Sequence, residues 1–190
     1  MWVASSDTSL SLYHSFDGIT WNNEGGNISR NIFSIHYANG TWVAGSSGLY
    51  YSIDGRTWLQ SNQSNAWFYS VYYGNNIWVA AEYTGNSGLY YSIDGKTWSN
   101  SNITIGKFRK IYYNNNTWIA VGDNGLYYSV DGKTWTQSNI INNKFYTVYC
   151  NNKICLVGSY DNKGIYYSEY TPKNSFLMIK DGKWTAQSIQ

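Results

Sequence analysis

The chain has 190 residues, which is enough for a well-buried core, and we expect one domain over residues 1–190. Charged residues make up 13% of the chain and aromatic residues 19%, a composition that excludes an intrinsically disordered protein. The net charge of +2 comes from scattered Lys and Arg, so we expect no nucleic acid partner. No stretch is apolar enough to span a membrane, and the N-terminus lacks the pattern of a secretory signal.

A turn of the form Ser-x-Asp-Gly-x-Thr-Trp occurs four times along the chain. The copies start at Ser15, Ser52, Ser92 and Ser129. A repeat of this length, about 38 residues, is typical of propellers and solenoids. The chain is therefore an array of one small unit.

The residue pattern of each unit predicts four short strands that are rich in aromatic and β-branched residues. In the clearest copy we expect strands over 107–113, 117–121, 125–130 and 133–137. The Asp-Gly turns and the Asn-Gly at 39–40 suit tight hairpins, because Gly accepts a positive φ. Repeated units of four antiparallel strands are typical of β-propeller blades.

The recurring second strand gives the number of units. It is marked by Trp2, Trp42, Trp78, Trp118 and, in the last copy, Cys155, so we expect an all-β propeller of five blades. Because the chain opens at a second strand, the first blade needs an inner strand from the C-terminus. We expect 175–180 to form an outer strand and 183–189 to form this closing inner strand, leaving no free sheet edge. The alternative is an incomplete ring whose ends pair with another subunit.

The repeated turn resembles the Asp-box, or BNR repeat, of sialidase-like propellers, and the resemblance covers nearly the whole chain. In that family the Ser and Asp side chains hydrogen-bond the turn backbone, and the Trp packs between blades. The family more often has one further residue between Asp and Thr, so we expect a tighter turn here. The resemblance gives these structural roles to Ser15, Asp17 and Trp21; Ser52, Asp54 and Trp58; Ser92, Asp94 and Trp98; and Ser129, Asp131 and Trp135.

The two cysteines stand where other copies have an aromatic pair. Tyr113 is expected to face Trp118 across a hairpin, and Cys150 and Cys155 hold the corresponding positions in the last copy. Such a cross-strand pair is close enough for a disulfide. The sequence leaves two interpretations open, a disulfide or two small buried thiols.

The resemblance to sialidases raises the question of catalysis. Family sialidases hold the substrate carboxylate with three Arg, and this chain has only Arg30, Arg56 and Arg109. Arg56 lies in a repeated turn at the outer rim, so the triad cannot be assembled and we expect no enzyme. His14 and His36 take positions where other copies have Tyr. With no zinc-ligand spacing, phosphate loop or nucleophile elbow, we expect no metal and no cofactor.

The loops between second and third strands differ from copy to copy, and we expect them on the face opposite the repeated turns. Loops on a rigid scaffold often bind ligands, and this face commonly does so in propellers. Amide groups beside aromatic rings suit a sugar and equally a protein partner, although short loops are rich in such residues in any case. The predicted ligand-binding residues are Asp7, Glu82, Tyr83, Asp123, Tyr160 and Asp161.

The sequence predicts a non-catalytic binding propeller that recognises a carbohydrate, as a lectin does, or a receptor protein. The alternative is a structural module of a larger assembly, because Asn- and Tyr-rich Asp-box arrays look similar to repeats in phage virion and bacterial surface proteins. A glycoside hydrolase is the remote alternative. We expect a soluble protein, with a virion or an extracellular surface as candidate locations.

Overall fold

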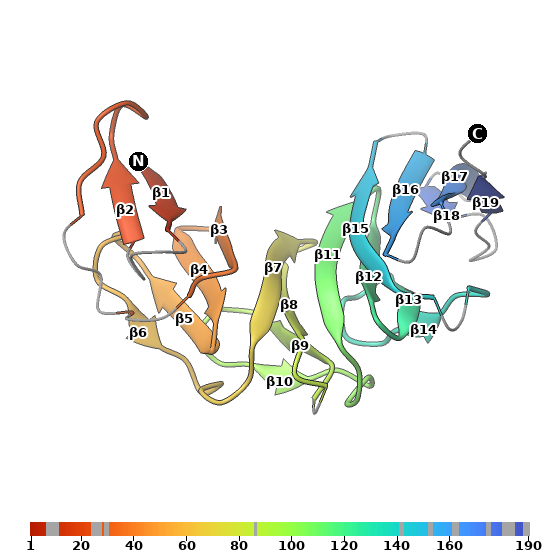
Figure 1. Cartoon of the computed structure of the whole chain (residues 1–190), viewed down its shortest axis with the longest axis horizontal. Coiled ribbons are helices and arrows are strands. Elements are labelled where there is room, and N and C mark those ends of the chain that lie inside the picture. The colour runs from red at the N-terminus through yellow and green to blue at the C-terminus, as the bar shows by residue number, and fades with distance from the viewer. Residues whose placement is uncertain are drawn as a thin grey trace.

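The computed structural model describes residues 1–6, 12–23, 28, 31–85, 87–140, 143–151, 154–160, 164–173, 176–179 and 185–187, with side chains up to residue 168. Within these residues all the named elements are strands, arranged in five antiparallel sheets. The sheets follow one another around an open arc, with the two termini on its opposite arms (Figure 1). No helix in the described part is long and apolar enough to cross a membrane.

The five sheets follow the predicted repeat. The first sheet contains β1 (Trp2–Ser5) and β2 (Leu12–Ser15). The second contains β3 (Ser34–Ala38), β4 (Thr41–Ser46), β5 (Gly48–Ser52) and β6 (Leu59–Gln60). The third contains β7 (Phe68–Gly74), β8 (Ile77–Glu82), β9 (Leu89–Ser92) and β10 (Ser99–Asn100). The fourth contains β11 (Phe108–Asn114), β12 (Thr117–Gly122), β13 (Gly125–Ser129) and β14 (Thr136–Gln137). The fifth contains β15 (Phe145–Cys150), β16 (Ile154–Ser159), β17 (Ile165–Lys173), β18 (Phe176–Ile179) and β19 (Thr185–Gln187).

The four repeated turns have one hydrogen-bond pattern. In the second sheet the Ser52 hydroxyl donates to Asp54 Oδ1 at 2.9 Å and accepts the Gly55 N–H at 2.8 Å. The same carboxylate oxygen accepts the backbone N–H groups of Arg56 and Thr57 at 2.9 and 2.8 Å. The turns at Asp17, Asp94 and Asp131 repeat these bonds. The Ser and Asp side chains therefore organise the turn backbone, as the resemblance implies.

These bonds favour the ionised carboxylates. The backbone N–H groups of Arg56 and Thr57 lower the pKa of Asp54 to about 2, and Asp17 is lowered in the same way. Burial raises the pKa of Asp94 and of Asp131, but the backbone hydrogen bonds outweigh it and both pKa values are lowered. Each turn therefore binds fewer protons in the folded chain than in the unfolded chain.

The protein is expected to lose stability in acid. A lowered folded-state pKa gives stability that is present above the unfolded value, about 3.9, and is lost as the pH falls toward the folded value. The urea midpoint should therefore drop between about pH 4 and pH 2. Asp54→Asn, which keeps an acceptor oxygen but does not titrate, should reduce that drop. Equal pH dependence in the variant and the parent would contradict this account of the turn.

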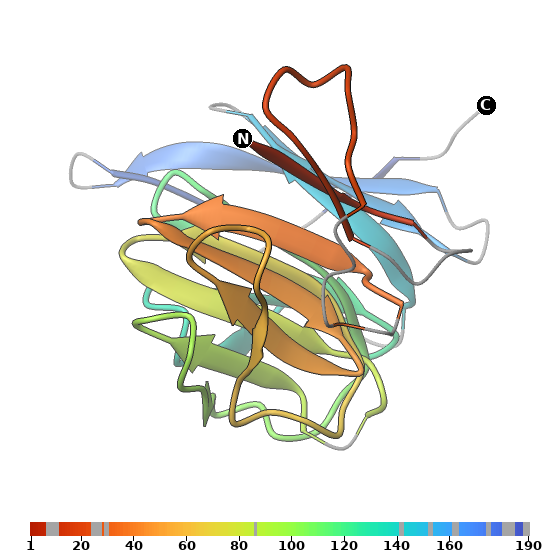
Figure 2. The ribbon, with the colours of Figure 1, turned by 90° about the vertical axis from the view of Figure 1, so that its left-hand side faces the viewer.

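Large apolar side chains fill the spaces between successive sheets, which lie one behind another when viewed from the N-terminal arm (Figure 2). Val43 and Leu49 of the second sheet form one buried cluster with Trp78 and Trp98 of the third. The side chain of Asn62 fastens the same two sheets, donating to the Trp98 carbonyl at 3.0 Å and accepting the Trp98 N–H at 2.9 Å. Asn102 makes the same two bonds to Trp135 in the next sheet.

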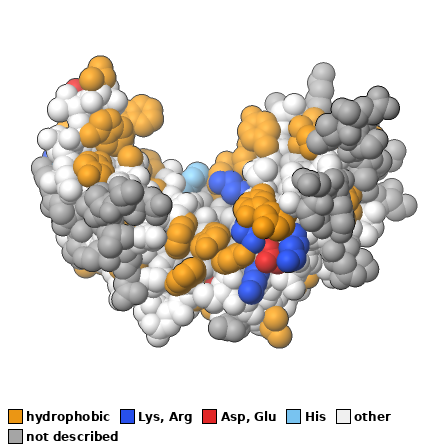
Figure 3. Space-filling view, viewed as in Figure 1, with side chains coloured by type: hydrophobic (Ala, Val, Ile, Leu, Met, Phe, Trp, Pro, Cys, Tyr) orange, Lys and Arg blue, Asp and Glu red, His pale blue; other side chains and the backbone are white. Residues whose placement is uncertain are grey.

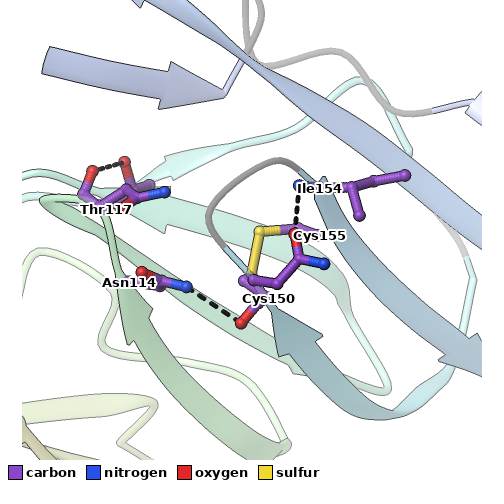
Figure 4. The surroundings of a disulfide bond; sticks show 7 residues. Asn114, Thr117, Cys150, Ile154 and Cys155 are labelled. Atoms are coloured by element: carbon purple, nitrogen blue, oxygen red, sulfur yellow. Dashed lines mark hydrogen bonds between the residues drawn. A yellow bond between two sulfur atoms is a disulfide. The ribbon is translucent and has the colours of Figure 1, made fainter.

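The cysteine pair forms a disulfide. Cys150 and Cys155 face each other across β15 and β16, with Cα atoms 4.0 Å apart. Of the two interpretations left open by the sequence, the structure contains the disulfide. Asn114 of β11 donates its side-chain N–H to the Cys150 carbonyl at 3.0 Å, so the hairpin is also tied to the fourth sheet (Figure 4).

The predicted closure of the ring is not present among the described residues. β1 pairs only with β2, and the C-terminal strands β18 and β19 both pair with β17. β19 aligns Thr185 with Tyr167, the register in which Thr136 of β14 aligns with Tyr128. The segment expected as a closing inner strand is therefore the outer strand of the fifth sheet.

The prediction failed because β17 is longer than its counterparts. It continues to Lys173 and turns back as β18, so the chain reaches its outer strand only after an added hairpin. Asp181-Gly182-Lys183 precedes β19 in the sequence as Asp131-Gly132-Lys133 precedes β14. The sequence allowed this alignment, but residues 181–184 themselves lie outside the described part of the chain.

Candidate binding surface

The first strands β3, β7, β11 and β15 line the inner side of the arc, and the last three begin with a β-bulge (Figure 1). The register shifts around Tyr69, Arg109 and Tyr146, each of which follows a buried Phe. A bulge re-aims the side chain of its extra residue. The corresponding residue before β3 is Phe33. One position per sheet is thus presented at the same end of the inner strands.

The residue after each second strand stands beside this position. The backbone N–H groups of Tyr83, Asp123 and Tyr160 donate to carbonyls at the entrance to the first strand, at 2.8, 2.9 and 2.9 Å. Tyr83 stacks on Tyr69 with ring centroids 4.3 Å apart, and Tyr160 lies 4.9 Å from Tyr146. In the fourth sheet the two positions hold an ion pair instead.

Arg109 is the centre of this arrangement. Its Nε lies 2.9 Å from Asp123 Oδ1, and its Nη2 donates to the Tyr83 hydroxyl. Its guanidinium carbon lies 4.4 Å from the ring centroids of both Tyr83 and Tyr146, which come from the sheets on either side. Cation–π contacts of this kind are worth about 0.5–2 kcal/mol each. One side chain therefore links the third, fourth and fifth sheets.

The electrostatics fix the protonation states in this cluster. Burial opposes the charge on Arg109, but the hydrogen bond and the negative charge of Asp123 outweigh it and raise the Arg109 pKa. Burial also raises the Tyr83 pKa, and the lowering effect of Arg109 does not offset it. At neutral pH the cluster therefore contains the Arg109–Asp123 ion pair, whose net charge is zero, beside the protonated phenol of Tyr83.

Together these side chains form a line across four sheets, in which the Arg109 guanidinium joins the rings of the second and third sheets to those of the fifth. Phe33 lies 6.2 Å from Trp67 and 4.5 Å from Tyr69, which extends the line into the second sheet. Rings at both ends are exposed, while the Arg109–Asp123 pair is mostly buried. Figure 3 shows hydrophobic side chains at the base of the hollow, with Lys or Arg and Asp or Glu among them. We call this line the aromatic row; it consists of Phe33, Trp67, Tyr69, Tyr83, Arg109, Tyr146 and Tyr160.

A second line of rings follows the same inner strands. His36, Tyr72, Tyr112 and Tyr149 have successive centroid separations of 4.6, 5.4 and 5.4 Å. Burial lowers the His36 pKa, and the charge of Lys110 lowers it further, so His36 is neutral at pH 7. Within the described residues no group of His, Cys, Asp and Glu could hold a metal ion.

The structure brings three of the six predicted ligand-binding residues together. Tyr83, Asp123 and Tyr160 all surround Arg109, from which Tyr160 lies 6.0 Å away. Glu82 is buried, and its carboxylate accepts hydrogen bonds from Thr84 and from the backbone N–H groups of Gly85, Ser87 and Gly88. It organises its own loop and is not presented to a ligand. Asp7 and Asp161 lie outside the described residues.

Arg109, Tyr69 and Tyr146 do not stand out as binding residues in the sequence. A signal exists, because each directly follows the Phe that opens a first strand, at Phe68, Phe108 and Phe145. At that repeated position an Arg replaces an aromatic residue. Nothing in the sequence marks the bulge that turns these residues toward the loop end of the strand.

The comparisons identify the fold. No protein-family model matches the sequence, and no curated protein matches it significantly. Solved structures do match, with TM-scores of 0.66 to the computationally designed Ika8 protein, 0.62 to YCF48 bound to D1 peptide and 0.62 to a GH74 xyloglucanase from Xanthomonas campestris. The identities are 11%, 16% and 12%, and the matches cover 98%, 92% and 93% of this chain.

The chain spans only 63%, 59% and 34% of the lengths of these three proteins. At such low identities the likeness concerns the fold alone. YCF48 and the GH74 enzymes are β-propeller proteins, and the repeated four-stranded sheets of this chain have the same architecture. The chain therefore has a β-propeller fold.

Proposed function

We propose that the chain is an Asp-box propeller module that binds carbohydrate, without catalysis, along the aromatic row. The observation that supports this most directly is the row from Phe33 to Tyr160, in which two groups of aromatic rings are joined by the guanidinium of Arg109. Sugar rings present C–H faces that stack on aromatic side chains and hydroxyls that need hydrogen bonds. An extended row suits a chain of several sugar units better than one monosaccharide.

The charge distribution also suits a neutral, hydroxyl-rich ligand. Arg109 is the cation of the row, and Asp123 already neutralises it at 2.9 Å. The exposed rings of Trp67, Tyr146 and Tyr160 offer stacking surface on both sides of this pair. An anionic ligand would have to compete with Asp123 for the guanidinium, which favours a neutral oligosaccharide.

The carboxylates support a non-catalytic role. Glycoside hydrolysis needs two carboxyl groups that flank the scissile bond. All six carboxylates whose side chains are described are engaged by the protein: four in the repeated turns, Glu82 in its loop and Asp123 in the ion pair. None of these six is left to act as an acid or a nucleophile.

The identification as an Asp-box protein rests on the turns. All four have the Ser–Asp–backbone hydrogen bonds that the resemblance implies, and Trp58, Trp98 and Trp135 are buried between sheets. The turn bonds support the resemblance at all four copies and the buried Trp at three, since Trp21 is 40% exposed. Of the three Arg, Arg56 lies in a turn, Arg109 is paired with Asp123 and Arg30 lies outside the described residues, so the described part of the chain offers no three-Arg site of the sialidase kind.

The proposal is tested by a glycan array probed with the purified chain and with Trp67→Ala and Tyr160→Ala variants. Both changes remove an exposed ring from the row, so we expect binding to fall at least about tenfold, the result of losing about 1.4 kcal/mol of contact. Tyr37→Ala is the matched control, because Tyr37 is an exposed ring at the opposite end of an inner strand. It should bind as the parent does.

An array without signal from a folded, monodisperse chain would reject the carbohydrate proposal. Binding that all three variants lose equally, or that none loses, would place the site elsewhere. If the array gives no signal, a protein ligand on the same row becomes the better proposal.

A structural module of a larger assembly, such as a virion or bacterial surface protein, is the second candidate function. One separate observation favours it: apolar side chains are exposed at both ends of the arc. Pull-down of one fixed partner, with a blank glycan array, would support it.

A further inference from the structure

Two successive interfaces between neighbouring sheets are built from the same two halves, whereas at the interface of the fourth and fifth sheets Ile119 and Leu126 lie in a buried cluster that contains Cys155 and no Trp. The leading half is the pair formed by Val43 and Leu49 in the second sheet, and the trailing half is formed by Trp78 and Trp98 in the third. The next interface repeats the pattern, with Val79 and Leu89 against Trp118 and Trp135. At both interfaces the leading pair is fully buried and the Trp pair is at most 3% exposed.

At the C-terminal end of the arc, no further sheet of the described residues packs against the leading half. Its residues in the fifth sheet are Leu156 and Ile165, at the positions of Val43 and Leu49. They are 42% and 39% exposed. We call this pair the leading end.

At the N-terminal end, no further sheet of the described residues packs against the trailing half. Its residues in the first sheet are Trp2 and Trp21, at the positions of Trp78 and Trp98. They are 62% and 40% exposed. The inner edge of β1 is also unpaired among the described residues, whereas β4 and β8 pair on both sides. We call this pair the trailing end.

We propose that two copies of the chain associate head to tail, with the leading end of one copy packed against the trailing end of the other. The chain itself specifies this occupant, because it forms the same contact repeatedly between its own sheets. Leu156 and Ile165 are an aliphatic pair of the kind that two Trp side chains cover at two interfaces inside the chain, and the trailing end supplies two Trp. Side chains that are exposed in successive repeats, such as Ile53 and Ile93, form no repeated buried contact inside the chain.

The contact is heterologous, because it joins two different surfaces. A heterologous contact closes into a ring when the rotation between copies allows and otherwise gives open chains of copies. The two ends lie on opposite arms of the open arc (Figure 1), so in a pair of copies with their open sides facing one another each leading end would meet the other trailing end. This proposal is independent of the carbohydrate-binding proposal.

The test uses one variant for each end, Leu156→Asp and Trp2→Asp, with light scattering coupled to size exclusion as the measurement. The parent should have at least twice the mass of one chain. In a closed pair either variant weakens both contacts, because each contact uses one leading and one trailing end, so each variant alone should shift toward single chains. An equimolar mixture should recover a dimer, because the intact trailing end of the first variant meets the intact leading end of the second.

Ile53→Asp is the control, because it places the same charge on an exposed residue away from both ends. It should keep the mass of the parent. Circular dichroism of every variant separates lost association from lost folding. A parent that stays monomeric over a concentration series overturns the proposal. So does a mixture that stays monomeric although each variant is folded, since that result excludes a head-to-tail contact.

Discussion

Replacing Trp98 by alanine is expected to lower the free energy of unfolding by about 3–5 kcal/mol, the range for removing a buried aromatic side chain. Trp98 is 2% exposed and lies in the cluster that joins the second and third sheets. Its indole N–H donates to the Gly95 carbonyl at 3.3 Å, and its backbone is held by Asn62. The loss should therefore appear as an opened interface between two sheets.

Trp21→Ala, measured at a concentration where the chain is a single copy, is the matched control, because Trp21 holds the same place in its repeat but packs against no further sheet of the described residues. Its replacement should cost about 1 kcal/mol or less, as is usual for a partly exposed side chain. Urea unfolding followed by circular dichroism measures both values. Equal losses in the two variants would contradict the account in which the interface, and not the turn, gives this Trp its importance.

Gly88→Ala is expected to cost about 2–5 kcal/mol, the sum of left-handed backbone strain and overpacking. Gly88 has a φ of +69° and directly precedes β9, the third strand of its sheet. A Cβ added there would lie 2.2 Å from the carbonyl oxygen of Ile103. That oxygen accepts the N–H of Leu89 at 3.0 Å, so it cannot move away without losing this bond.

Gly40→Ala separates strain from crowding. Gly40 also has a positive φ, +75°, but a Cβ there would meet no atom within 4 Å. Only the backbone strain should therefore act in this variant, and the free energy of unfolding should fall by about 1–2 kcal/mol. Thermal or urea unfolding of both variants gives the comparison. If Gly40→Ala proves as destabilising as Gly88→Ala, the contact with Ile103 is not the source of the larger effect.

The repeated turn determines much of this fold because its chemistry is local. Ser52 and Asp54 bond to a backbone only a few residues away, so the sequence alone predicts the turn, the hairpin and the strand on either side. Cross-strand partners follow from the same register, which is why Tyr113 faces Trp118 and Cys150 faces Cys155. The number of sheets comes from counting copies.

The features that the sequence predicts wrongly, or does not predict at all, depend on contacts between neighbouring sheets of the chain. The closing strand is predicted in the wrong sheet, because Asp181-Gly182-Lys183 resembles both Asn39-Gly40-Thr41 and Asp131-Gly132-Lys133, and only the pairing of β19 with β17 separates the two alignments. Asn62 and Asn102 follow the outer strands as part of a recurring Ser-Asn pair, but their bonds to Trp98 and Trp135 cross from one sheet to the next.

The candidate site divides in the same way. By itself the sequence determined a row of repeated sheets with variable loops at one end, and it singled out Tyr83, Asp123 and Tyr160 on those loops. Only the tertiary structure decided that these three surround Arg109, because the bulge in β11 and the angle between sheets set where its guanidinium lies. Local hydrogen bonds can be predicted from neighbouring residues, whereas a side chain that contacts three sheets is positioned by the packing of all three.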